Sequence, residues 1–94
     1  MSSGRYILNE AGDPVEETDL LTWARWFDRA DRKIAFTEMG ECHVSTVFLG
    51  LDHNYGAGPP LLYETMIFGG HHDQYQERYA SRQEAILGHD RAVI

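Results

Sequence analysis

The chain has 94 residues, which is enough for one domain with a single hydrophobic core and too few for a second. Eight basic and 15 acidic residues give a net charge of −7, which disfavours direct binding to nucleic acid or to an anionic membrane surface. Cys42 is the single cysteine, so an intramolecular disulfide is excluded and a reducing compartment is expected.

The N-terminal third predicts a short strand, a turn and a helix. Residues 5–8 form a short apolar run, and residues 9–14 carry the Gly and Asp-Pro that favour a turn. Asp19 is a suitable N-cap for a helix from Leu20 to about Asp31. The apolar stripe of that helix consists of Leu20, Trp23, Ala24 and Phe27. No apolar run approaches the ~20 residues of a membrane span, and no signal-peptide pattern opens the chain, so we expect a cytoplasmic protein.

The middle of the chain predicts antiparallel strands. Residues 33–38 alternate between polar and apolar side chains, and residues 42–49 are rich in β-branched and aromatic side chains. A loop of Gly and Pro follows at 50–60. Residues 61–68 are then apolar on both faces, which is typical of an interior strand, and 74–80 favour one more strand. We therefore expect the segments 42–49 and 61–68 to pair at the centre of the sheet.

The C-terminal segment predicts a helix to about Val93. Ser81 and Glu84 match a capping box, in which the two side chains satisfy each other's backbone donors. The residues expected to be buried are Ala85, Ile86, Ala92 and Val93. The whole pattern predicts a single α+β domain, with a small antiparallel sheet of four or five strands and two helices packed on it.

Two polar residues are predicted to lie in the apolar layer. Glu64 shares a strand face with Leu62, Met66 and Phe68, and helical spacing places His89 on the buried side of the last helix. A helix lying across the sheet would bring Glu64 within reach of His89. The pair would then be either a structural hydrogen bond or the polar floor of a pocket in which Glu64 accepts from a ligand.

The loop from Asp52 to Pro60 is a candidate binding surface. Gly56 and Gly58 permit unusual backbone conformations, and two prolines stiffen its exit. It would present a group of polar and aromatic side chains, Asp52, His53, Asn54 and Tyr55. The alternative is an ordinary hairpin loop.

Two arginines are the best candidates for meeting a phosphate. Arg78 and Arg82 flank the capped start of the last helix, where backbone donors favour anions. Aromatic side chains elsewhere suit stacking on a base, so a nucleotide-like small molecule is one candidate ligand.

Histidines raise the alternative of a metal site. His71, His72 and Asp73 are acceptable ligands for zinc or another divalent ion, with His43 predicted nearby at the start of its strand. The spacing matches no recognised zinc or hydrolase motif, so neither a metal nor any other cofactor is predicted. A small metal-dependent hydrolase that uses the His71–Asp73 loop remains the alternative function.

Three segments resemble a group of small proteins encoded in bacteriophage and prophage genomes. They are VSTVFLGLDH (residues 44–53), PPLLYETMIFGG (59–70) and ERYASRQEAILGH (77–89). The group carries no established activity, and the resemblance implies an accessory protein that acts on host defence or regulation. We expect a non-enzymatic, acidic, soluble protein that acts by binding in one of two ways. It would inhibit a host protein by docking on it, or it would sequester a small nucleotide-like ligand as a homo-oligomer.

Overall fold

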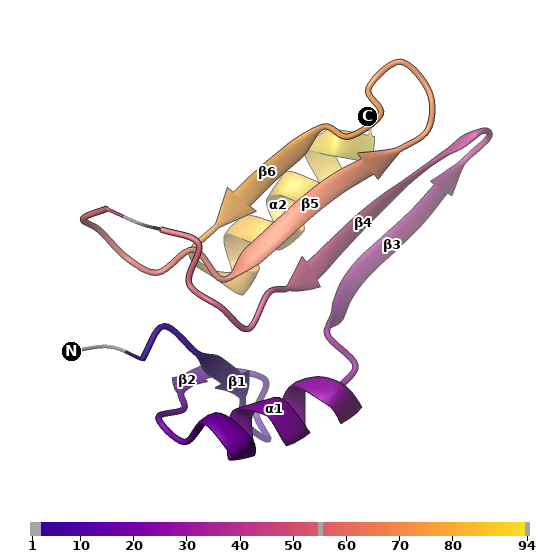
Figure 1. Cartoon of the computed structure of the whole chain (residues 1–94). Coiled ribbons are helices and arrows are strands. Elements are labelled where there is room, and N and C mark those ends of the chain that lie inside the picture. Colours follow the sequence, from indigo (N-terminus) through magenta and orange to yellow (C-terminus); the bar gives the residue numbers. More distant parts are fainter. Residues whose placement is uncertain (1–2, 55, 94) are drawn as a thin grey trace.

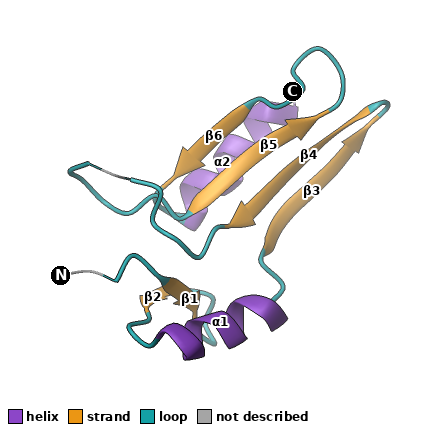
Figure 2. Ribbon diagram, in the orientation of Figure 1, coloured by secondary structure: helices purple, strands orange, loops and turns teal. Residues whose placement is uncertain are grey.

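The computed structural model describes residues 3–54 and 56–93, which form two helices and six strands (Figures 1 and 2). The elements in chain order are β1 (Tyr6–Leu8), β2 (Pro14–Glu16), α1 (Leu20–Arg29), β3 (Lys33–Met39), β4 (Cys42–Phe48), β5 (Tyr63–Phe68), β6 (Gln76–Tyr79) and α2 (Arg82–Val93). The predicted α+β class is confirmed. Neither of these helices is long and apolar enough to cross a membrane.

The main sheet has four antiparallel strands in the order β3-β4-β5-β6. The central position predicted for segments 42–49 and 61–68 is confirmed, because β4 and β5 pair with each other and lie between the edge strands. Val44 pairs with Ile67, Thr46 with Thr65 and Phe48 with Tyr63. Since directly opposed residues point to the same side of a sheet, these pairs build one continuous face.

Helix α2 covers that face and lies behind the sheet in Figure 1. Its buried residues are Ala85, Gly88 and His89, at the spacing of one helical stripe. The predicted burial of Ala85 is confirmed, whereas Ile86 is exposed on the outer side of the helix because it lies off this stripe. Ala92 and Val93 are half-buried. The predicted cap is present, since the Glu84 amide donates to Ser81 Oγ at 3.1 Å.

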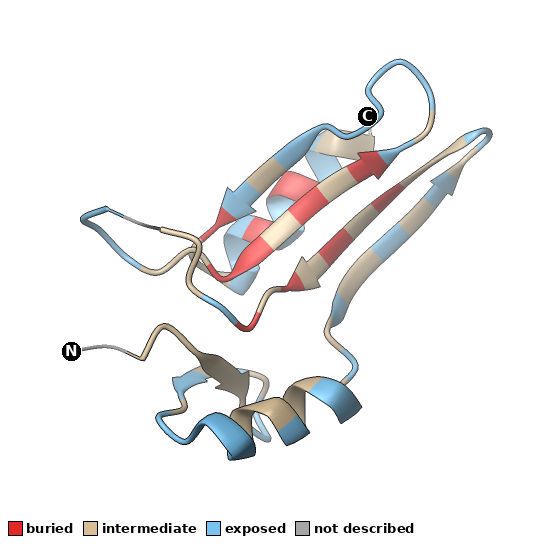
Figure 3. Ribbon diagram, viewed as in Figure 1, coloured by how far each residue is buried: buried red, intermediate tan, exposed pale blue. Residues whose placement is uncertain are grey.

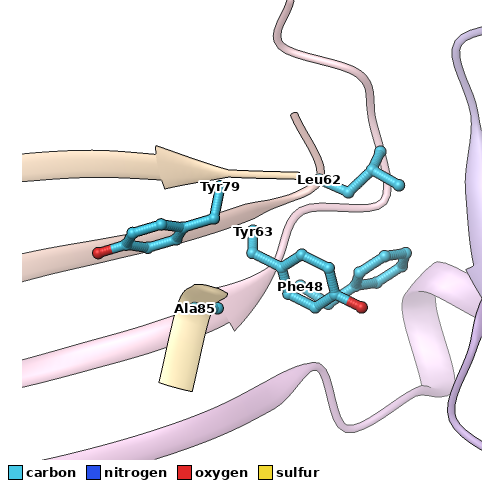
Figure 4. Close-up of a cluster of buried hydrophobic side chains, with 5 residues drawn as sticks. All are labelled: Phe48, Leu62, Tyr63, Tyr79 and Ala85. Carbon is cyan, nitrogen blue, oxygen red and sulfur yellow. The ribbon is translucent and has the colours of Figure 1, made fainter. Parts of the chain in front are cut away.

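Five of the buried hydrophobic side chains form one cluster that joins α2 to strands β4, β5 and β6 (Figure 4), and Val44 and Ile67 are buried further along the same face. The cluster consists of Phe48, Leu62, Tyr63, Tyr79 and Ala85. Gly88 allows the helix to approach closely, because a Cβ built there would lie 2.1 Å from the Tyr79 hydroxyl oxygen. The absence of a side chain at one helical position therefore sets how near α2 packs to β6.

The N-terminal elements form a separate small layer at one end of the sheet (Figure 1). Helix α1 packs against β1, so the expectation that both helices lie on the main sheet holds for α2 and is wrong for α1. Trp23 Nε1 donates to the carbonyl oxygens of Tyr6 at 3.2 Å and Gly50 at 3.0 Å. Trp26 meets Phe48 edge-on, with ring centroids 5.8 Å apart. These aromatic contacts join the N-terminal layer to the core.

Candidate functional site: the open face of the sheet

The two faces of the main sheet differ in what covers them. Residues along β4 and β5 alternate between buried and half-buried up to the exposed Phe68, as the colours of Figure 3 show. The buried set includes Thr46 and Thr65, which form hydrogen bonds with each other and with His89, so it lies on the side of α2. No described element packs across the other side, which we call the open face. Its side chains, taken from the strand register, are Lys33, Phe36, Glu38, His43, Ser45, Val47, Glu64, Met66, Phe68, Gln76 and Arg78.

A stack of three rings crosses the open face from β3 to β5. The His43 ring lies between Phe36 and Phe68, with centroid distances of 5.1 and 4.9 Å and interplanar angles of 36° and 27°. Phe36 is 45% exposed and Phe68 is 38% exposed. Removing such rings from contact with water is favourable, so an exposed aromatic cluster is typical of a surface that binds another protein.

Charged side chains lie at one end of this stack. The Lys33 ammonium is 5.4 Å from the centroid of the Phe36 ring. Arg78 Nε donates to Glu64 Oε2 at 2.9 Å, and Gln76 Nε2 donates to the same oxygen at 2.8 Å. The Glu64 carboxylate is therefore paired, and the cross-strand pair carries no net charge.

The prediction that Glu64 meets His89 is wrong. Glu64 lies on the open face with Arg78, whereas His89 lies on the opposite side of the sheet under α2. Because β5 is apolar on both faces, its own sequence does not determine which face the helix covers. The pairing of β5 with Val44, Thr46 and Phe48 of β4 places the buried layer on the side opposite Glu64.

His89 belongs to a buried polar cluster with three threonines. Its Nε2 lies 2.9 Å from Thr37 Oγ1, its Nδ1 lies 2.7 Å from Thr46 Oγ1, and Thr46 Oγ1 lies 2.6 Å from Thr65 Oγ1. A neutral imidazole has one donor and one acceptor nitrogen, so the hydroxyls can satisfy both. The cluster ties α2 to three strands of the sheet.

Burial determines the protonation of this histidine. His89 is only 3% exposed, and the loss of solvation lowers its pKa below the ordinary value of 6.5, against a smaller opposing effect of Asp90. The threonines donate or accept without carrying charge. The cluster is thus built for a neutral imidazole, and its depth in the core makes it a structural element.

Two of the predicted loop residues have their polar groups occupied by the loop itself. Asp52 Oδ1 accepts from the amides of Asn54 at 2.8 Å and Leu61 at 3.0 Å. The Asn54 side chain donates to the carbonyl oxygens of Ala57 at 3.1 Å and Pro59 at 3.0 Å. Their role is to shape the loop.

The other two residues of this prediction have different outcomes. His53 is half-buried, and its backbone amide donates to the Leu61 carbonyl oxygen at 3.1 Å. Tyr55, which the loop was also predicted to present, lies outside the described residues. The side-chain hydrogen bonds of Asp52 and Asn54 therefore shape this loop from within.

The two predicted anion-binding arginines lie on different elements. Arg78 is on the open face with Glu64, and Arg82 is the first residue of α2. At this helix start, the Ser81 hydroxyl accepts a hydrogen bond from the Glu84 amide and donates one to Glu84 Oε1 at 2.9 Å, so one of the free amide donors is already occupied. The arginines are thus not brought together around a shared anion site.

The histidine loop lies between β5 and β6. His71, His72 and Asp73 are exposed, and Asp73 Oδ1 accepts from the Gly69 amide at 2.7 Å. His43, the other suggested ligand, is held in the aromatic stack. Within residues 3–54 and 56–93, no group of three or more His, Cys, Asp or Glu side chains is arranged to hold a metal ion.

A shallow hollow of about 250 Å³ lies between this loop and the end of α2, and its lining consists of Ile67, His72, Tyr75, Arg91 and Ala92. Arg91 Nη2 is 3.2 Å from Glu77 Oε1, and the Tyr75 hydroxyl donates to Glu77 Oε2 at 2.5 Å. Glu77 therefore already supplies the anionic partner that a phosphate would otherwise provide.

Comparison with protein-family models, with curated proteins and with solved structures gave no match to this chain. The candidate site therefore rests on its own geometry.

Sequence reasoning missed Phe36 and Phe68 as site residues and treated His43 as a possible ligand. Part of the signal was local, because residues 33–38 alternate and only a short turn separates them from the strand at 42–49. Pairing these strands places Glu38 opposite His43 and Phe36 opposite Ser45, so Phe36 and His43 share one face. Phe68 joins them because β5 pairs with β4 and places Phe68 opposite His43.

Proposed function

We propose that this protein is a non-enzymatic accessory protein of the phage type, which acts in the host cytoplasm by binding a host protein through the open face. The observation that supports this proposal is the exposed Phe36–His43–Phe68 stack on a sheet face that no described element covers. Aromatic side chains that are rigid and solvent-exposed contribute strongly to protein interfaces.

The surroundings of the stack favour a protein partner over a small molecule. The rings lie on a broad sheet surface, whereas small ligands bind mostly in concave pockets. A partner with an apolar patch and a basic rim would suit the net charge of −7. Sequestration of a nucleotide-like ligand has less support, since Asp52, Asn54 and Arg78 are engaged within the chain.

The test is to capture host proteins on the immobilised chain, purify the protein identified, and measure its affinity directly. Phe36→Ala and Phe68→Ala should each weaken binding by roughly 30-fold, the effect of losing a hot-spot side chain. Leu87→Ala is the matched control, because Leu87 is exposed on the outer side of α2 and its loss should leave the affinity unchanged.

Equal affinity of all four proteins for the purified partner would contradict the use of the open face. Melting temperatures of the variants should stay close to that of the parent, since Phe36 and Phe68 lie outside the buried core. A partner that binds the Leu87 variant poorly would instead place the working surface on α2.

A further inference from the structure

The charges of the open face are separated between its two ends. One end carries a row across the strands that consists of Lys33, Val47, Glu64 and Arg78. Because Glu64 and Arg78 form an ion pair with each other, the row keeps the positive charge of Lys33. At the other end, Glu38 lies opposite His43. The row between them is uncharged and contains Phe36, Ser45, Met66 and Gln76.

This pattern is complementary to itself. If a second copy is turned so that its strands run antiparallel to the first, Lys33 of each copy faces Glu38 of the other. Phe36 lies in the middle row, so it meets Phe36 of the second copy near the twofold axis. If the strands of the two copies ran parallel instead, the end that carries Glu38 in one copy would lie over the end that carries Glu38 in the other, and likewise for Lys33. Repulsion between like charges disfavours this arrangement.

The size of the face limits the strength of such a pairing. Four strands at ~4.8 Å spacing and ~20 Å length present about 400 Å² in plan per copy. Side-chain relief would bring the total buried by two copies close to the ~1,000 Å² at which specific interfaces begin. Two stacked sheets ~10 Å apart leave room for interdigitated rings. A weak, reversible dimer is therefore expected, with a Kd of about micromolar order.

We infer that a second copy of this chain covers the open face when no other partner is bound, with the two sheets packed face to face and Lys33 paired with Glu38 across a twofold axis. This inference rests on the proposed function, because both use the open face: a host protein could bind it only after the dimer separates. The apolar stack supplies the attraction, and the paired end charges determine the orientation.

Charge reversal tests this geometry. Sedimentation across a concentration series should show a dimer for the parent chain, and Lys33→Glu and Glu38→Lys should each weaken it by at least about tenfold. An equimolar mixture of the two variants should form a heterodimer, because every cross-copy pair is then opposite in charge. The double variant Lys33→Glu/Glu38→Lys should dimerise like the parent.

The variants should fold normally, because Lys33 and Glu38 are exposed and lie ~13 Å apart along the strand, which exceeds the Debye length, so salt screens their interaction within one chain. A parent chain that stays monomeric at about 1 mM would overturn the inference, as would a dimer that neither charge reversal affects. So would a mixture of the variants that stays monomeric.

The two proposals fail in different ways. If the chain is monomeric while Phe36→Ala still loses a purified host partner, the dimer is wrong and the proposed function stands. If the charge-reversed mixture dimerises while Phe36→Ala and Phe68→Ala bind that partner normally, the dimer stands and the proposed function is wrong.

Discussion

The two faces of the main sheet are built from alternate residues of the same strands, yet they handle polar and aromatic groups in different ways. On the covered face, Thr46, Thr65 and His89 satisfy one another out of contact with water. On the open face, Phe36 and Phe68 remain partly exposed around His43. One face uses hydrogen bonds to fix a helix, and the other keeps apolar surface in solvent. Under the proposed function, that division separates stability from binding.

The closest packing on the covered face should be the most sensitive to change. Gly88→Ala places a Cβ where the buried Tyr79 ring lies, so the helix must move away from β6. We expect a loss of about 3 kcal/mol in the free energy of unfolding, which outweighs the ~1 kcal/mol gained in helix propensity. Chemical denaturation measures this loss.

Two further variants check that the effect arises from this contact. Leu87→Ala changes an exposed neighbour in the helix and should alter stability little. Tyr79→Leu removes the ring, so Gly88→Ala should cost much less in that background. Losses that simply add would show that the helix does not rest on the Tyr79 ring.

Val44 and Val47 compare the two faces within one strand. Val44 is fully buried under α2, whereas Val47 is half-buried on the open face. Val44→Ala should cost about 2 kcal/mol, from lost burial and a residual cavity, and Val47→Ala less than about 1 kcal/mol. Equal losses in chemical denaturation would mean that something also covers the open face in solution, as the inferred dimer would at high concentration.

The sequence predicted both helices, the strands of the main sheet and the central strand pair, because alternation, capping residues and β-branched runs are local signals, but it did not predict the short strand β2. It did not predict the face that α2 covers. Residues 61–68 are apolar on both sides, so the choice depends on pairing with β4, which is a long-range contact. The same limit explains why Glu64 was placed beside His89, and why the ring stack was missed.

The pH dependence of stability tests the covered face without altering its shape. The pKa of His89 is lowered in the folded state, so the unfolded chain binds the proton more readily. The contribution of the neutral imidazole is therefore complete above about 6.5, the pKa of an unperturbed histidine, and is lost as the pH falls below it. Melting temperatures measured downward from neutral pH should show this decline.

His89→Gln isolates the contribution of the imidazole. Glutamine retains a donor and an acceptor but does not titrate, so the variant should be less stable at neutral pH and should vary less with pH below about 6.5. His72→Gln is the control, because His72 is exposed in the loop before β6. An unchanged pH dependence in His89→Gln would assign the decline to another group.

The smallest effect is expected where the covered face leaves a polar atom unsatisfied. Within the described part of the chain, the buried hydroxyl of Tyr63 has no hydrogen-bond partner, and burial raises its pKa. Tyr63→Phe removes a group whose desolvation is uncompensated, so stability should stay constant or rise by up to about 1 kcal/mol. Tyr75→Phe is the matched control, because that hydroxyl donates to Glu77 and its removal should give a slight loss. Denaturation of both variants decides the point: a fall of more than about 1 kcal/mol in Tyr63→Phe would mean that the Tyr63 hydroxyl is hydrogen-bonded in solution.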